Sequence, residues 1–145
     1  MNTMEKIGYW GDHHHTKWLD LLRIGLGAIL FAKGLYFISD TASLAEMLGN
    51  SRFEFLSFMI AHYVAFAHLV GGVLVALGLL TRVAILFQLP ILIGAVVFVN
   101  ASKGFFSINF ELEISLVVLF LLILFLIYGS GPLSVDFYMR KNPGA

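Results

Sequence analysis

Residues 55–81 read FLSFMIAHYVAFAHLVGGVLVALGLLT and contain no Asp, Glu, Lys or Arg. A helix that crosses a bilayer needs about 20 predominantly apolar residues, and this stretch is long enough to do so. Two further stretches, 83–102 and 114–135, are equally free of charged side chains. A fourth apolar stretch, 19–38, is interrupted by Arg23 and Lys33. Together these segments predict four transmembrane helices.

The composition of the whole chain agrees with a membrane protein. Of the 145 residues, 59% are hydrophobic and 12% are charged, and the mean hydropathy is +0.90. Soluble domains carry roughly 25% charged residues, because their surface has to face water. A soluble monomer is therefore excluded. The net charge is zero, so no basic face is available and we expect no nucleic acid among the partners.

We expect a single transmembrane domain over residues 1–145, with spans at about 18–38, 58–80, 83–100 and 112–128. The spans have to be helical, because backbone in lipid must satisfy its own hydrogen bonds and four segments cannot close a barrel. The predicted fold class is therefore all-α, a polytopic four-helix bundle in the membrane. A very short turn at residues 80–82 makes the second and third spans an antiparallel pair.

The distribution of Lys and Arg between the loops predicts the orientation. The side that holds both termini and the 80–82 turn carries more of them than the other side, which has only Arg52 and Lys103. The residues on the richer side are Lys6, Lys17, Arg82, Arg140 and Lys141. This asymmetry predicts that both termini lie in the cytoplasm.

Ionisable side chains inside a membrane helix are costly, so each is a candidate functional residue. Lys33, His68 and Glu113 fall in the outer half of the predicted bundle, and His62 and Asn100 lie near the same end. We identify Lys33, His68 and Glu113 as a candidate pocket for a quinone or another small amphiphile. The structural alternatives are that Lys33 and Glu113 form an ion pair or extend to the membrane interface, and that His68 is a buried and satisfied histidine.

The chain contains no cysteine, which excludes disulfides, thiolate metal sites and a thiol relay of its own. His13, His14 and His15 are adjacent in the N-terminal segment, but consecutive residues on a helix cannot converge on one metal ion. We therefore expect no metal site and no intrinsic cofactor, with quinone as the one candidate ligand.

Small side chains four residues apart predict where membrane helices touch, because they let two backbones approach closely. The pairs in this sequence are Ala28 with Ala32, Ala61 with Ala65, and Gly72 with Ala76. Helix packing is the simplest interpretation of all three.

Two stretches resemble the DoxX family of small bacterial membrane proteins. Residues 71–82 (GGVLVALGLLTR) resemble the signature of that family's second span, and residues 129–136 (GSGPLSVD) resemble its closing motif. Arg23 ahead of Gly25 fits the same pattern, as does a glutamate at the start of the fourth span, Glu111 or Glu113. The resemblance runs over residues 18–140, nearly the whole chain.

The resemblance implies a multi-pass four-helix protein of the bacterial inner (cytoplasmic) membrane. It also implies association with respiratory or sulfur-oxidising quinone-reducing complexes, or with membrane redox assemblies that protect against oxidative stress. We therefore expect an accessory subunit of a quinone-linked or respiratory oxidoreductase complex that is not catalytic on its own. Its partners would be the lipid bilayer and other subunits of the membrane complex. The alternatives are a non-enzymatic scaffold or assembly subunit and, third, a small transporter or channel that would have to oligomerise.

The closing motif also allows a structural prediction. Gly129 can adopt the left-handed conformation that ends a helix, and Pro132 prevents the helix from continuing. Asp136 then lies at the same depth as Arg23 and Arg82. We predict an ion pair between Asp136 and one of these arginines that ties the C-terminal segment to the rest of the chain.

Overall fold

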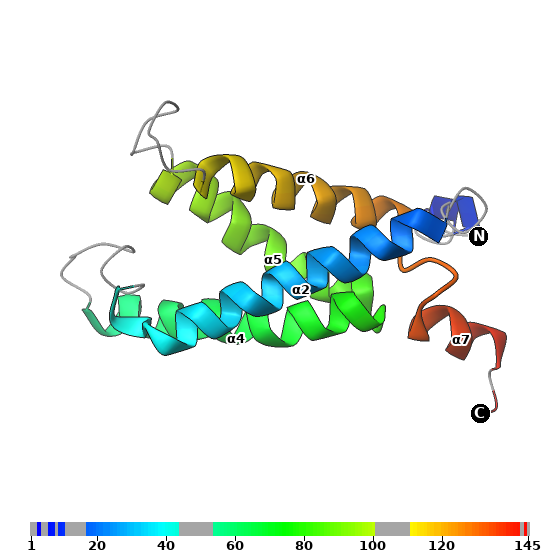
Figure 1. Cartoon of the computed structure of the whole chain (residues 1–145), viewed down its shortest axis with the longest axis horizontal. Helices are drawn as coiled ribbons and strands as arrows, with labels where there is room; N and C mark the ends of the chain where they lie inside the picture. The colour runs from blue at the N-terminus through cyan, green and yellow to red at the C-terminus, as the bar shows by residue number, and fades with distance from the viewer. Residues whose placement is uncertain are drawn as a thin grey trace.

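The computed structural model describes residues 3, 6–7, 9–10, 17–43, 54–100, 111–142 and 144. Within this part of the chain all regular structure is helical, which confirms the predicted all-α class. The helices are α2 (Lys17–Ser39), α4 (Glu54–Leu77), α5 (Thr81–Gly94), the π-helix η1 (Ala95–Asn100), α6 (Glu111–Tyr128) and α7 (Val135–Lys141) (Figure 1).

Two of the described helices are long and apolar enough to cross a membrane, at Lys17–Ser39 and Phe58–Leu77. Two shorter apolar helices follow, at Thr81–Val97 and Glu113–Tyr128. Each predicted span overlaps one of these four segments. Pro90 lies inside α5, and the helix changes from α to π geometry at Ala95. A crossing by all four segments stays a prediction.

Glycines set the contact between α2 and α4. A Cβ on Gly27 would lie 2.5 Å from the Ala76 nitrogen, and one on Gly72 would lie 2.6 Å from the Phe31 nitrogen. A Cβ on Gly34 would lie 2.7 Å from the Leu69 nitrogen, so the backbones touch here as well. The predicted Gly72 face is therefore a packing face, as small residues allow.

The predicted face of α2 was wrong. Ala28 and Ala32 are exposed on the surface, whereas Gly27 and Gly34 are buried against α4. Gly27 and Gly34 are seven residues apart, which is close to two helical turns and places them on one side of the helix. The spacing of small residues alone does not distinguish this side from the neighbouring one.

The four longer helices share a core near the α4–α5 turn. Leu26 and Leu30 of α2 meet side chains of the other three helices there, and several of these are completely buried. In this core, the completely buried apolar residues of the other helices are Val75, Ile85, Leu122 and Phe125. Figure 1 shows that the α2–α4 pair and the α5–α6 pair diverge toward the opposite end. We call the end with the α4–α5 turn the turn end.

Backbone conformations at the turn end follow from its glycines. Gly78 has φ +68° and Gly129 has φ +80°, in the left-handed region that glycine adopts at little cost. Gly129 N–H donates a hydrogen bond to the Phe125 carbonyl at 2.9 Å and ends α6, as the sequence predicts. Ser134 then begins α7, because its hydroxyl accepts a hydrogen bond from Phe137 N–H at 3.1 Å.

Candidate functional site

The buried polar side chains form two groups. One group consists of His68 on α4 and Gln88 on α5. The other group lies at the turn end, where residues 71–82, residues 129–136 and the start of α2 meet. We call this second group the motif junction; its buried polar members are Asp20, Arg23, Thr81, Ser130 and Ser134.

A buried ion pair joins α2 to the closing segment. Arg23 Nη1 donates to Asp20 Oδ1 at 2.9 Å, and both side chains are 0% exposed. Arg23 Nη2 donates to the Leu133 carbonyl at 2.8 Å, while Leu133 N–H donates to Asp20 Oδ2 at 3.3 Å. The pair therefore satisfies both backbone polar groups of Leu133, which lies 110 positions after Arg23. This connection fixes the closing segment against α2.

Gly78 leaves room for this pair. A Cβ at Gly78 would lie 3.1 Å from Arg23 Cζ and would collide with the Ser134 Cβ. Position 78 therefore needs glycine for two reasons, its positive φ and the space beside Arg23. The two stretches quoted from the sequence are thus in direct contact, although each was interpreted separately.

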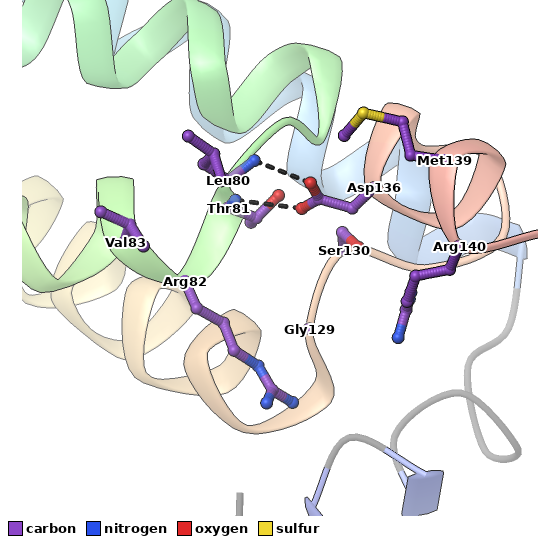
Figure 2. Close-up of a pocket in the computed structure, with 9 residues that line it drawn as sticks. All are labelled: Leu80, Thr81, Arg82, Val83, Gly129, Ser130, Asp136, Met139 and Arg140. Carbon is purple, nitrogen blue, oxygen red and sulfur yellow. Dashed lines mark hydrogen bonds between the residues drawn. The ribbon is translucent and has the colours of Figure 1, made fainter. Parts of the chain in front are cut away.

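The predicted ion pair of Asp136 with Arg23 or Arg82 was wrong, because Asp136 binds backbone amides instead. Asp136 Oδ1 accepts a hydrogen bond from Leu80 N–H at 2.8 Å, and Oδ2 accepts one from Thr81 N–H at 3.2 Å (Figure 2). These amides open α5 and have no partner within the helix, so the carboxylate caps it from α7. Arg23 is already engaged with Asp20. The C-terminal segment is tied down, but by helix capping.

Sequence reasoning missed Asp20 as the partner of Arg23. A signal for it was present, because residues three apart on a helix are neighbours and a carboxylate and a guanidinium at this spacing can pair. The contact with Leu133 could not be read from the sequence, since it joins residues 110 positions apart.

A cavity of about 430 Å³ lies beside the motif junction. It is bounded by the start of α5, the Gly129–Ser130 segment and α7 (Figure 2). Arg82 lines it and donates to the Ile127 carbonyl at 3.3 Å, near the end of α6. Figure 2 shows the Arg82 guanidinium turned toward Gly129 and away from the carboxylate of Asp136.

His68 is buried where α4 faces α2. Its Nδ1 lies 2.9 Å from the Val64 carbonyl, so this nitrogen carries the proton that the carbonyl accepts. The Phe37 ring packs edge-on against the imidazole, with 5.3 Å between centroids. Gln88 of α5 donates a hydrogen bond to the carbonyl of Ala67, the residue before His68. In a neutral ring held this way, Nε2 is a hydrogen-bond acceptor.

Lys33 and Glu113 are not joined to each other. Both are exposed, and Lys33 Nζ lies 6.0 Å from the centroid of the Tyr36 ring. Gly34, the residue after Lys33, packs on the backbone of His68, so Lys33 lies on the helix next to this histidine. Glu113 belongs to the diverging α5–α6 pair. The structure therefore shows Lys33 on the helix that packs beside His68, with no direct contact from Glu113.

Of the other polar candidates from the sequence, those that the structure describes do not join either group of buried polar side chains. His62 is exposed and its Nδ1 lies 2.9 Å from the Phe58 carbonyl. Among the described residues, no group of three or more His, Cys, Asp or Glu is placed to hold a metal ion. The side chain of Asn100 and the residues His13, His14 and His15 lie outside the described part.

The described part of the chain is a small helical protein whose long apolar helices are held together at one end by a buried ion pair and a capping carboxylate. Residues 18–101 match the sequence profile of the DoxX family. The curated protein "Putative oxidoreductase CatD" of Bacillus subtilis (strain 168) is 34% identical over 123 residues, which is 84% of this chain and 87% of that protein. The chain belongs to the DoxX family, as the two motifs indicate. No solved structure matches it significantly.

Proposed function

We propose that the chain is an integral membrane accessory subunit of a quinone-linked or respiratory oxidoreductase complex. The observation that carries this proposal is the 34% identity, over most of both chains, to the protein named "Putative oxidoreductase CatD". The chain itself contains no cysteine, so any thiol chemistry would belong to partner subunits. Its own contribution would be to dock those partners in the bilayer and to shape a quinone pocket.

In this proposal α2, α4, the α5–η1 segment and α6 all cross the bacterial inner membrane as a four-helix bundle. Both termini and the α4–α5 turn would face the cytoplasm, on the side richer in Lys and Arg. Cysteine labelling tests this topology, because the sequence has no cysteine and a single introduced cysteine is then the only thiol in the chain. A membrane-impermeant maleimide should label Asp40→Cys in intact cells and leave Lys141→Cys unlabelled. Labelling of both variants, or of Lys141→Cys alone, would refute this topology.

The quinone pocket would centre on His68. Its Nδ1 is held by Val64, which leaves Nε2 to accept a hydrogen bond from a quinol hydroxyl. The Phe37 ring supplies an aromatic wall, and Lys33 on the neighbouring helix supplies a cationic donor for a quinone carbonyl. The pocket proposed here does not include Glu113, which belongs to the diverging α5–α6 pair.

Quinone retention tests this pocket. The protein is purified in mild detergent, and the quinone bound per chain is extracted and quantified. His68→Leu should lower the retained quinone by about fivefold or more, since a hydrogen bond in a dry site contributes about 1 kcal/mol or more. His62→Leu is the matched control, because it removes an exposed histidine from the same helix and should retain the wild-type amount. Equal retention in both variants would remove His68 from the pocket.

A non-enzymatic scaffold or assembly role is the second candidate. Gly25, Ala28 and Ala32 lie on one exposed side of α2, and small residues on such a surface permit close approach by a helix of another subunit. In that case Ala28→Leu would abolish assembly of the partner complex while the isolated chain kept its stability. Normal assembly with a loss of redox activity would favour the first proposal instead.

A further inference from the structure

The outer face of α7 is apolar. Val135, Tyr138 and Met139 are 37%, 62% and 46% exposed, and their i, i+3, i+4 spacing places them on one side of the helix. Leu133, just before the helix, is 63% exposed. We call these four side chains the α7 stripe. The apolar stripe of a surface helix ordinarily faces the protein core, so a stripe that faces outward indicates a surface for another partner.

Contacts at the motif junction fix the orientation of α7. Asp136 caps the start of α5, and its own backbone N–H donates to the Gly78 carbonyl at 3.0 Å. The backbone of Leu133 is bound by Asp20 and Arg23. A helix of seven residues is not stable alone in water, so these contacts hold it in place. The α7 stripe therefore points in a defined direction.

The stripe continues the exposed apolar surface of α5. Met139 lines the same cavity as Leu80 and Val83, so these side chains are neighbours. Figure 2 shows the Met139 side chain extending from α7 toward the α4–α5 turn. Leu80 is 55% exposed, and Val83 and Phe87 are exposed further along α5. In the proposed topology this surface of α5 faces lipid, and the α7 stripe extends it beyond the end of the helix.

The turn end also carries side chains typical of a membrane–water interface. Trp18, at the start of α2, and Tyr138 are each 62% exposed, and Trp and Tyr concentrate at that interface. Lys17 and Lys141 are exposed at the same end, and lysine can bury its apolar stem while its ammonium group stays among the headgroups. The carboxylates in the described part of the turn end are engaged in the buried ion pair and the helix cap. The lysines are therefore complementary to the phosphates of a lipid surface.

We propose that α7 is an interfacial anchor, whose stripe inserts between the headgroups and the first acyl carbons of the bilayer. Helices of this kind bury their apolar face about 5–10 Å into that boundary. Lys141, at the end of α7, would lie among the headgroups. The bilayer is favoured over a protein partner because the stripe is continuous with the surface of α5 that faces lipid. This inference rests on the proposed membrane topology and is independent of quinone binding and of electron transfer.

Site-directed spin labelling tests the proposal. The sequence has no cysteine, so a single introduced cysteine carries the only nitroxide. The full-length protein is reconstituted into vesicles of phosphatidylcholine and phosphatidylglycerol, and the accessibility of each label to oxygen and to a water-soluble nickel chelate is measured. Oxygen concentrates in the bilayer and the chelate stays in water, so the ratio of the two accessibilities reports depth.

Labels on the α7 stripe should report the interface. The oxygen-to-chelate ratio for Tyr138→Cys should be several times that for Lys141→Cys, which is an exposed position outside the stripe. Val135→Cys should give a ratio like that of Tyr138→Cys while keeping the tyrosine. Phe120→Cys, at a position 65% exposed in the middle of α6, should report the bilayer interior.

A charge on the stripe should withdraw α7 from the lipid. Tyr138→Glu, introduced into the labelled Val135→Cys protein, should lower the oxygen-to-chelate ratio to that of a label in water, because an ionised carboxylate is costly to bury in an apolar environment. Tyr138→Phe is the matched control and should leave the ratio high. An unchanged ratio with Tyr138→Glu would overturn the proposal.

The remaining outcomes separate this proposal from the topology on which it rests. Equal ratios at positions 138 and 141, with a lipid-exposed label at 120, would overturn the α7 anchor and leave the topology standing. A label at 138 that is closed to both reagents would place the stripe against protein and would also overturn the anchor. A label at 120 in water would refute the membrane crossing by α6, and this inference with it.

Discussion

Separating the Asp20–Arg23 pair tests how the closing segment is held. Asp20→Asn keeps the size of the side chain but leaves the Arg23 guanidinium buried without a counter-charge. Arg23→Met has the converse effect and leaves the Asp20 carboxylate alone. Both side chains are completely buried, so each single substitution should lower the free energy of unfolding by about 3–5 kcal/mol.

The double variant gives the sharper result. With both charges gone, the Asn introduced at position 20 can still accept a hydrogen bond from Leu133 N–H. The Leu133 carbonyl then loses its partner, which costs about 1–3 kcal/mol. We therefore expect the double variant to be more stable than either single variant. If the two effects were independent, they would add to about 6–10 kcal/mol.

The assay is equilibrium unfolding in mixed detergent micelles, followed by tryptophan fluorescence, with all four proteins of the cycle measured together. Protease cleavage after Lys141 or Arg140 provides a local measure, because a released α7 should be cut faster in the single variants. The interpretation would be refuted by single variants within about 1 kcal/mol of the wild type, or by a double variant that loses the sum of both effects.

Three further substitutions test the geometry of the helices. Gly27→Ala should destabilise the protein by about 1–3 kcal/mol, because its Cβ meets the α4 backbone. Gly25→Ala has open space and should stabilise the protein by about 0.5–1 kcal/mol. Equal effects of the two substitutions in thermal unfolding would contradict the α2–α4 contact. Leu80→Gly should stabilise by about 1 kcal/mol, since Leu80 has φ 47° and glycine relieves that strain, and a lower Tm would argue against it. Asp136→Ala should cost about 1–2 kcal/mol and expose α7 to protease, and unchanged cleavage would show that the cap is dispensable.

The sequence predicts the helices well because their cause is local. Long runs without charged residues need a helical backbone in lipid, and each predicted span overlaps a helix of the structure. The end of α6 at Gly129 is equally local, since glycine is the residue that adopts the required positive φ. The membrane topology and the full four-helix bundle are not tested by the structure and stay predictions.

The partners of the polar groups were harder to predict, because they depend on contacts between distant segments. Arg23 and Asp136 were correctly placed at one end of the molecule, but each has a different partner from the one predicted. Asp136 binds backbone amides, which no pattern of charged side chains reveals. Lys33 and Glu113 stay apart because their helices belong to pairs that diverge, and residue spacing carries no information on that divergence.

The composition of the native complex tests the proposed function most directly. The protein is extracted from its own membrane in mild detergent, and everything that co-migrates with it is identified and quantified by mass spectrometry. We predict stoichiometric subunits of a flavin, haem, sulfur-metabolising or respiratory enzyme, together with oxidoreductase activity in the same fraction. Migration of the chain alone, or with a secretion, envelope or transport assembly, would contradict the accessory-subunit proposal.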